Sequence, residues 1–190
     1  MYRSKKILLR PFTSVDARYL CEMKENFAFT KAFGGRPFPN NLEGEQEWIS
    51  RMYPSGLLST IILAVEEIES KTFIGYISAT KIDYINSNAQ VGIIFHKNSR
   101  GKEYFMEASI LFYAYLFNEI NLNKVYSGIL TYNELVLEND KKLGFSIDGI
   151  MKEQIFQGGK YHDVYIVSLT AKDFFERNGE IYKQILYSGT

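Results

Sequence analysis

The stretch from residue 89 to residue 131 constrains the fold of this chain more than any other feature. A short apolar run at 89–96 is followed by a helical stretch at 102–120 and by a second apolar run at 124–131. The helical stretch is apolar on nearly every side, which indicates burial against a sheet. Two strands joined by such a helix form a βαβ crossover with parallel strands, and we expect it to be right-handed.

The segments on either side of this crossover predict an α+β layout with antiparallel hairpins. Thr13 and Asp16 resemble a capping box at the start of a helix, and Asn133 is a candidate N-cap for a short helix ending at Gly144. The last helix is expected to be broken or bent near Asn178-Gly179. Strands are expected at 7–12, 60–67, 73–83, 147–156 and 161–169, and the other helices at 14–26, 41–53 and 171–186.

Composition and charge exclude several classes of function. Lys+Arg and Asp+Glu are both 22, and the resulting net charge of zero argues against a non-specific binder of nucleic acid or of an anionic membrane. The single cysteine, Cys21, rules out an internal disulfide, and with only two histidines it argues against a structural zinc site. We find neither a signal peptide nor the roughly 20 apolar residues of a membrane span. The expectation is a soluble, cytoplasmic protein without a metal.

The loop that leads into the long helix resembles a known family. Residues 96–108, His-Lys-Asn-Ser-Arg-Gly-Lys-Glu-Tyr-Phe-Met-Glu-Ala, are similar to the coenzyme A pyrophosphate loop of the GNAT superfamily of N-acetyltransferases. The most similar branch is that of the ribosomal-protein alanine and spermidine acetyltransferases. Further matches follow in order from Leu9-Arg10-Pro11 to about residue 170; they include Gly75-Tyr76-Ile77, Val91-Gly92-Ile93, Asn133, Lys142-Leu143-Gly144-Phe145, Gly149 and Gly159-Lys160-Tyr161-His162-Asp163.

The resemblance implies the GNAT fold, which has a mixed, mostly antiparallel sheet with a central βαβ crossover and helices on both faces. Residues 1–190 would form one N-acetyltransferase domain, with 171–190 as a C-terminal helical extension. Acetyl-CoA would be the cosubstrate, lying in the cleft between strand 89–96 and strand 124–131. A helix N-terminus suits the pyrophosphate because its backbone N–H groups are unpaired and carry partial positive charge.

The resemblance also assigns residues to the cofactor site. The backbone of Ile93, Ile94 and Phe95 would bind the pantetheine arm, and Asn133 would close the far side. Glu103 and Phe105 replace two glycines of the family loop. The loop and first helical turn would contribute Arg100, Gly101, Lys102, Glu103, Tyr104, Phe105 and Met106.

The catalytic positions depart from the family pattern. An amine attacks the thioester directly in the family, and a backbone N–H near Ile94 would stabilise the oxyanion. The usual acid, a tyrosine or serine on the helix after Asn133, aligns with Asp140 or Val136, and the usual glutamate base aligns with Gln90. Asp140 is therefore the candidate acid, provided that burial raises its pKa.

Without a strong base, a neutral amine is the hardest requirement. At pH 7 about a tenth of an α-amino group is neutral, but only about four in ten thousand lysine-like amines are. We therefore expect acetyl transfer to a low-pKa primary amine, such as a protein N-terminal α-amine or an amino sugar. Tyr84 and Tyr132 could supply a hydroxyl near the acceptor, and His96 or His162 a base, although packing tyrosines and exposed or hydrogen-bonded histidines are more common. Trp48 and the aromatic residues of 27–38 could line the acceptor pocket or equally belong to the core.

Two alternatives to an enzyme stay open at this stage. A degenerate GNAT protein would bind CoA or a protein partner without catalysis, and a third reading is a binding domain that has lost the cofactor. The first of these is motivated by Glu103, Phe105, Gln90, Val136 and Asp140. The extension from residue 171 is a candidate homodimer surface.

Overall fold

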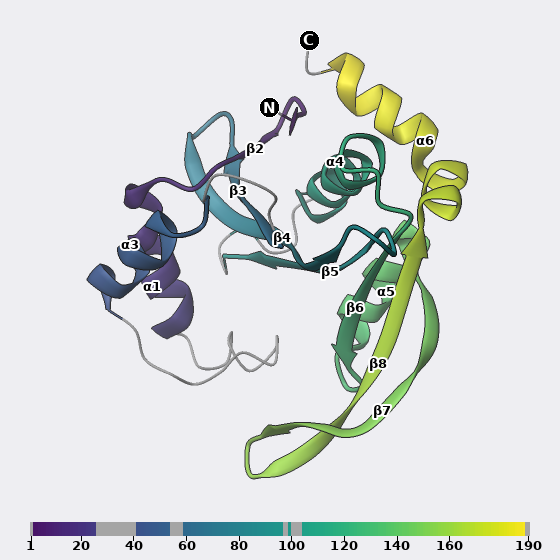
Figure 1. Ribbon diagram of the computed structural model, residues 1–190. Helices are drawn as coiled ribbons and strands as arrows, with labels where there is room; N and C mark the ends of the chain where they lie inside the picture. The colour runs from purple at the N-terminus through teal and green to yellow at the C-terminus, as the bar shows by residue number, and fades with distance from the viewer. Residues whose placement is uncertain (1, 26–40, 54–58, 97–98, 100–103, 189–190) are drawn as a thin grey trace.

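In the part of the chain that the structure describes, eight strands form one sheet (Figure 1). The computed structural model describes residues 2–25, 41–53, 59–96, 99 and 104–188. The strands are β1 (Tyr2–Arg3), β2 (Ile7–Arg10), β3 (Ile61–Glu67), β4 (Thr72–Asp83), β5 (Asn88–Phe95), β6 (Lys124–Leu130), β7 (Ser146–Gln157) and β8 (Lys160–Thr170). Their order is β1-β2-β3-β4-β5-β6-β8-β7, and only β5 and β6 are parallel neighbours among these strands.

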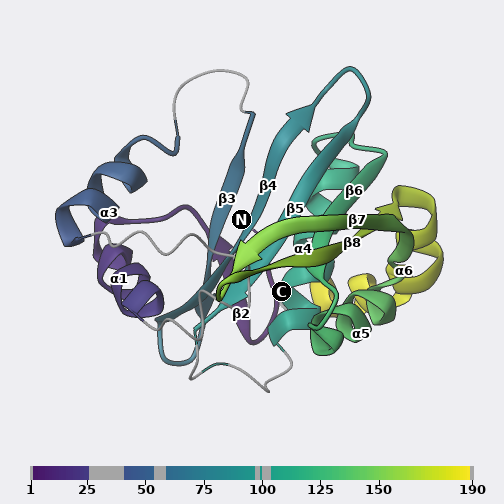
Figure 2. The ribbon, with the colours of Figure 1, turned by 90° about the horizontal axis from the view of Figure 1, so that it is seen from below.

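Helices cover both faces of this sheet (Figures 1 and 2). On one face lie α4 (Tyr104–Asn118), α5 (Glu134–Leu143) and α6 (Ala171–Ser188), which share one large apolar cluster with the strands. On the other face a short 3-10 helix, η1 (Ser14–Asp16), leads into α1 (Ala17–Glu25), which packs beside α3 (Leu42–Ser50). A second, smaller apolar cluster joins α1 and α3 to β3 and β4.

The central crossover confirms the strongest expectation from the sequence. α4 connects the parallel strands β5 and β6, and its side chains Leu111, Phe112 and Leu116 are fully buried. The helix carries apolar residues on nearly all sides because the sheet lies on one side of it and α5 and α6 contact it on others. Within the described residues, no helix combines the length and apolarity needed to cross a bilayer.

The structure departs from the expected elements in two places. The short strand β1 was not expected; it pairs with β2 through Tyr2 and Arg3. Of the break or bend expected near Asn178-Gly179, the break does not occur, because α6 runs without interruption from Ala171 to Ser188. The Asn178 side chain is buried and donates hydrogen bonds to the backbone carbonyls of Leu143 and Phe174. These bonds offset the low helix propensity of asparagine.

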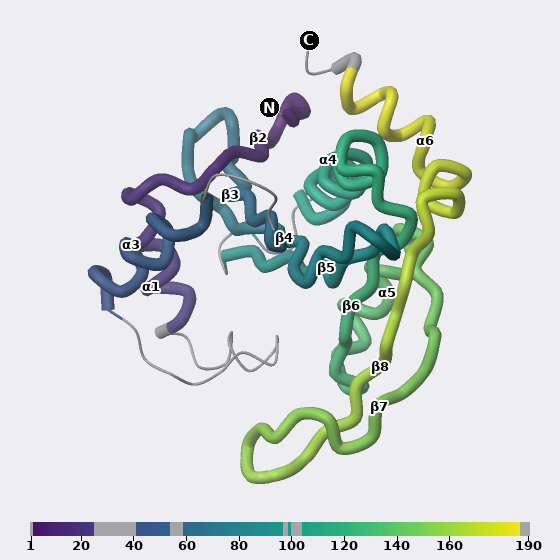
Figure 3. The backbone as a smooth tube through the Cα atoms, in the orientation of Figure 1, coloured from purple at the N-terminus to yellow at the C-terminus, as the bar shows by residue number. Residues whose placement is uncertain are grey.

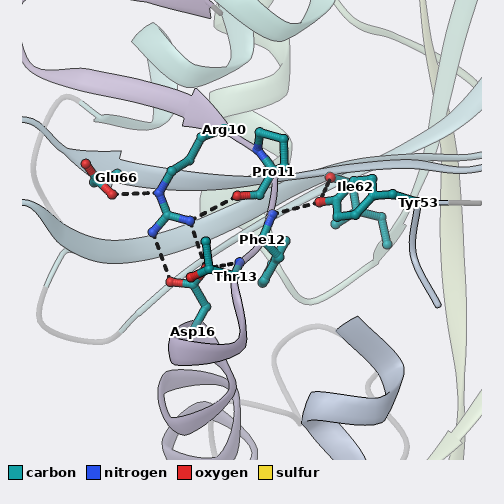
Figure 4. A network of polar contacts seen from close by, with 8 residues as sticks. All are labelled: Arg10, Pro11, Phe12, Thr13, Asp16, Tyr53, Ile62 and Glu66. Atoms are coloured by element: carbon teal, nitrogen blue, oxygen red, sulfur yellow. Dashed lines mark hydrogen bonds and ion pairs between the residues drawn. The ribbon is translucent and has the colours of Figure 1, made fainter. Parts of the chain in front are cut away.

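The start of α1 is fixed by the polar group that the sequence singled out. The Asp16 carboxylate accepts hydrogen bonds from the Thr13 backbone N–H at 2.8 Å and from the Thr13 hydroxyl at 3.1 Å. Arg10 donates two further bonds to the same carboxylate, at 2.8 and 2.9 Å, and also contacts Glu66 at 2.6 Å (Figure 4). This network ties the end of β2 to β3 and to the first turn of the α1 region.

Candidate functional site

β5 and β6 pair over only three residues and then separate. The paired residues are Asn88–Gln90 on β5 and Lys124–Tyr126 on β6, although β5 continues to Phe95 and β6 to Leu130. The backbone trace shows the two strands starting side by side and then diverging (Figure 3). We call this divergence the splay, and Gln90 and Tyr126 stand at its apex. It lies where the sequence placed the cofactor.

Backbone groups of β5 face the splay because no strand covers them there. The His96 N–H donates to the Ile74 carbonyl on β4, and the register between the two strands is unshifted from Gly75 to Thr80. In an antiparallel ladder, bonded and non-bonded residues alternate. The N–H of Ile94 is therefore directed toward β4, and the N–H groups of Ile93 and Phe95 are directed into the splay. The side chain of Ile94 packs instead with the α1–α3 cluster.

A close approach between β4 and β5 occurs beside these groups. A Cβ atom at Gly75 would lie 2.3 Å from the Ile94 carbonyl oxygen and 2.8 Å from the Phe95 Cα atom. Both neighbours are backbone atoms, so neither can rotate away. Only glycine fits here, and it allows β5 to lie where its backbone faces the splay.

The expected cofactor loop lies largely outside the described residues. Arg100, Gly101, Lys102 and Glu103 belong to that part. The described helix begins at Tyr104, whose buried hydroxyl donates to the Glu67 carboxylate. Phe105 and Met106 are half-buried and pack against the main apolar cluster.

Asn133 and Asp140 lie on the other side of the splay. Asn133 is the N-cap residue of α5, as expected, although its side chain does not cap the helix backbone. Asp140 is on the second turn of α5, only 6% exposed, and burial raises its pKa from 3.8 to about 7. Asp140 therefore meets the condition set in the sequence analysis, that burial raises its pKa. Burial, and next the charge of Asp140, raises the pKa of the Tyr113 hydroxyl on α4. Val136 is half-buried and packs on the main cluster.

The α1–α3 pair carries its own buried charge. Glu45 of α3 is fully buried and forms an ion pair with Lys24 of α1. The Lys24 ammonium also lies 5.6 Å above the Trp48 ring. Burial, and next the charge of Glu45, raises the pKa of Tyr76 on β4 to about 12, so this phenol stays neutral. The aromatic residues at 27–38 lie outside the described residues.

The two histidines lie at the open end of the splay, on opposite sides. His96 follows β5, and its Nε2 atom is 3.8 Å from a carboxylate oxygen of Glu22 on α1. His162 lies on β8, donates from Nε2 to the Gln157 carbonyl at 3.1 Å, and contacts the Tyr132 ring edge-on. Tyr84 lies in the turn between β4 and β5, at the closed end, and is therefore remote from an acceptor.

The apex carries residues that sequence reasoning did not assign. The register places Thr80, Gln90, Tyr126 and Ser168 opposite one another on four neighbouring strands. Of these, only Gln90 was singled out from the sequence. The alternation of polar and apolar residues within each strand indicates which residues share a face, but the pairing that aligns neighbouring strands is not visible in the sequence.

Comparisons with known proteins agree with this geometry. Residues 6–146 match the family model described as "Acetyltransferase (GNAT) domain". The chain is 24% identical to the uncharacterized N-acetyltransferase p20 of Bacillus licheniformis, over 90% of this chain and 96% of that protein. It is 26% identical to spermidine N(1)-acetyltransferase of Escherichia coli strain K12, over 86% of this chain and 85% of that protein.

A solved structure gives the same picture of the fold. Spermidine N-acetyltransferase from Vibrio cholerae, in complex with CoA and spermine, superposes with a TM-score of 0.81. The match covers 89% of this chain and 98% of that chain, at 21% sequence identity. This likeness confirms the fold expected from the sequence.

Proposed function

The chain belongs to the GNAT acetyltransferase family, and we propose that it transfers the acetyl group of acetyl-CoA to a primary amine of low pKa. Family membership makes it an acyltransferase with acetyl-CoA as cosubstrate. The proposal concerns the acceptor: a protein N-terminal α-amine or an amino sugar attacks the thioester directly. One observation carries it, namely that the side chain at the apex of the splay, Gln90, is a neutral amide that cannot act as a base.

The absence of a base at the apex decides which amines can react. On the face of the sheet that carries Gln90, the described residues of β4, β5, β6 and β8 next to the apex have no carboxylate. The imidazole groups on this side belong to His96 and His162, which lie at the open end of the splay. Because the apex itself has no base, the proposal requires an amine that arrives neutral. That condition favours an α-amine over a lysine-like amine at pH 7 by a factor of a few hundred, on the order of the ratio of their neutral fractions.

The splay supports the assignment of the cosubstrate site. The N–H groups of Ile93 and Phe95 face it, and they are the groups that we assign to the pantetheine arm and to the oxyanion. The sequence assigned the oxyanion to the N–H near Ile94, but the register directs that group toward β4. Arg100, Gly101, Lys102 and the first turn of α4 are assigned to the pyrophosphate, and Asn133 to the far side.

Asp140 is the acid in this proposal. A group with a pKa of about 7 is partly protonated at neutral pH and can donate that proton to the departing thiolate. It lies on the α4 side of the sheet, whereas the Gln90 side chain lies on the other side.

A polyamine acceptor is the second candidate. It is favoured by the names of the relatives from Escherichia coli and Vibrio cholerae, which are spermidine acetyltransferases. The neutral apex argues against it, because the primary amines of a polyamine are almost fully protonated at pH 7.

The test is release of CoA from acetyl-CoA with four acceptors at pH 7. They are a peptide with an N-terminal alanine, glucosamine, spermidine and Nα-acetyl-lysine. We expect the first two to give the higher kcat/KM, and acetyl-CoA binding in calorimetry to weaken in Arg100→Ala. A clear preference for spermidine or Nα-acetyl-lysine would overturn the low-pKa acceptor, and failure to bind acetyl-CoA would overturn the cosubstrate site.

A further inference from the structure

A straight row of polar side chains crosses the sheet at the apex of the splay. Thr80 pairs with Gln90, Gln90 with Tyr126, and Tyr126 with Ser168, so four strands contribute one residue each. Residues directly opposite one another in a sheet project from the same face. None of the four is charged at neutral pH. We call these four residues the polar row.

The polar row projects from the face that carries α1 and α3. The adjacent residues Ala89, Val125 and Leu169 also pair with one another, and all three are buried in the cluster around α4. Side chains alternate between faces along a strand, so the polar row lies on the opposite side. Tyr76 and Ile94, which share this face, pack against the α1–α3 cluster. Figure 1 shows α4 on one side of β5 and the α1–α3 pair on the other.

The polar row has unused hydrogen-bonding capacity. Ser168 is only 7% exposed, yet among the described residues neither its hydroxyl, nor the Gln90 amide, nor the Tyr126 hydroxyl makes a hydrogen bond to the protein. The Thr80 hydroxyl reaches the Gln90 backbone carbonyl only at 3.4 Å. These polar groups are only partly covered, and side chains that make no bond within the protein are available to bond to a ligand on this face.

The surroundings of the polar row do not suit a polycation. The nearest charged side chain on the same face of β6 is Lys124, one row toward the closed end. On α1 and α3, the buried Glu45 is paired with Lys24, Glu47 is paired with Arg51, and the exposed Glu22 lies 3.8 Å from His96. Next to the row, a Cβ added at Gly92 would contact only the Ser78 hydroxyl, at 3.6 Å, so the face is open there. An ammonium placed against the row itself would lose hydration without a carboxylate of the row as counter-charge.

We propose that the polar row binds the acceptor through hydrogen bonds to its hydroxyl groups, and that the acceptor is a hydroxylated amine of the amino-sugar class. This proposal rests on the proposed function and narrows its acceptor. Hydroxyl and amide side chains can both donate to and accept from sugar hydroxyls. A site built to bind hydroxyl groups also rejects an amine that lacks them, because its own polar groups then stay unpaired.

The experiment compares two variants of the polar row with a matched control. Ser168→Ala and Gln90→Leu each remove hydrogen-bonding groups, whereas Ser127→Ala removes a hydroxyl from the opposite face of β6, next to Tyr126. Glucosamine is the hydroxylated probe and alaninamide the low-pKa amine without hydroxyls. We expect each row variant to raise KM for glucosamine about tenfold, as the loss of a hydrogen bond implies. In Ser168→Ala, KM for alaninamide and for acetyl-CoA should stay unchanged, as should all constants of Ser127→Ala.

The outcomes separate this proposal from the proposed function. Equal losses for glucosamine and alaninamide would overturn the polar row as a hydroxyl site, even though acetyl transfer occurs. If no amine is acetylated, the proposed function fails. Calorimetric titration of the CoA-bound protein with glucosamine then tests whether the polar row binds a hydroxylated amine. Binding that weakens in Ser168→Ala would support the row without catalysis, and no binding would overturn it. Thermal unfolding of each variant identifies losses that come from misfolding.

Discussion

Gln90 and Tyr126 form the last residue pair between β5 and β6 before the two strands separate. Their contact marks the boundary between a continuous sheet and an open one. Beyond it, backbone groups of β5 have no neighbouring strand and can bind a cosubstrate. At the boundary itself the side chain is the neutral amide of Gln90, on which the proposed preference for amines of low pKa rests.

Restoring a carboxylate at the apex should widen the range of acceptors. In Gln90→Glu we expect kcat/KM for spermidine to rise about 10²-fold, the usual contribution of a general base, and that for an α-amine to rise much less. The reason is that only the high-pKa amine arrives protonated. CoA release with both acceptors at pH 7 measures this ratio. An equal change for both amines would show that position 90 does not govern deprotonation.

Adding one methyl group at Gly75 should disturb the cosubstrate site without unfolding the chain. The new Cβ would lie 2.3 Å from the Ile94 carbonyl oxygen, so β5 must move at Ile94–Phe95. Displacements of this kind cost up to about 10²-fold in rate, and we expect that loss in kcat/KM for acetyl-CoA. Gly149→Ala is the matched control, because its Cβ would meet nothing within 4 Å. Normal kinetics in Gly75→Ala would contradict the conclusion that only glycine fits at this position beside β5.

Asp140→Asn should change the pH dependence of stability. The folded-state pKa of about 7 lies above 3.8, so the stability that Asp140 contributes is complete below about pH 4 and lost as the pH rises through 7. Asparagine cannot ionise. We expect the variant to match the parent near pH 4 and to exceed it by as much as about 4 kcal/mol at pH 8. Urea unfolding at the two pH values measures this, and parallel behaviour of both proteins would mean that the carboxyl is solvated.

The same variant should lose activity. If Asp140 supplies the proton to the thiolate, Asp140→Asn lowers kcat about 10²-fold and removes the fall of kcat that the parent shows above pH 7. Lys141→Gln, the next residue on the exposed part of α5, serves as the control. A pH–kcat profile of unchanged shape would exclude the acid role.

The Arg10–Asp16 pair should be important for folding. Burial alone would raise the pKa of Asp16, but the hydrogen bonds from Arg10 and Thr13 outweigh it and lower that pKa. The contribution to stability is therefore present above about pH 4 and lost as the pH falls through the folded pKa. Asp16→Ala leaves the Arg10 guanidinium without this partner, and we expect a loss of about 3–5 kcal/mol at pH 7.

A surface pair provides the comparison for that measurement. Glu47 and Arg51 are paired one helical turn apart and are both well exposed. Glu47→Ala should cost less than about 1 kcal/mol. If Asp16→Ala costs no more than Glu47→Ala in urea unfolding, the network in Figure 4 does not stabilise the fold.

The sequence predicted the helices and strands better than it predicted the arrangement of side chains in the site. The crossover from β5 through α4 to β6 could be predicted because its hydrophobic periodicity is local and its elements are long. The end of α5 at Gly144, where φ is 105°, and the start of α1 at Thr13 could be predicted from capping chemistry. The unbroken α6 could not, because the bonds made by Asn178 depend on a partner in another element.

By itself, the sequence determined the order of helices and strands, the parallel crossover and the resemblance to the family, since these follow from local patterns and short motifs. Only the tertiary structure decided which side chains meet. Strand register brought Thr80, Gln90, Tyr126 and Ser168 into one row. Packing of α5 against α4 removed water from Asp140 and moved its pKa to about 7. Register and burial arise from contacts between residues far apart in the chain, which local patterns do not encode.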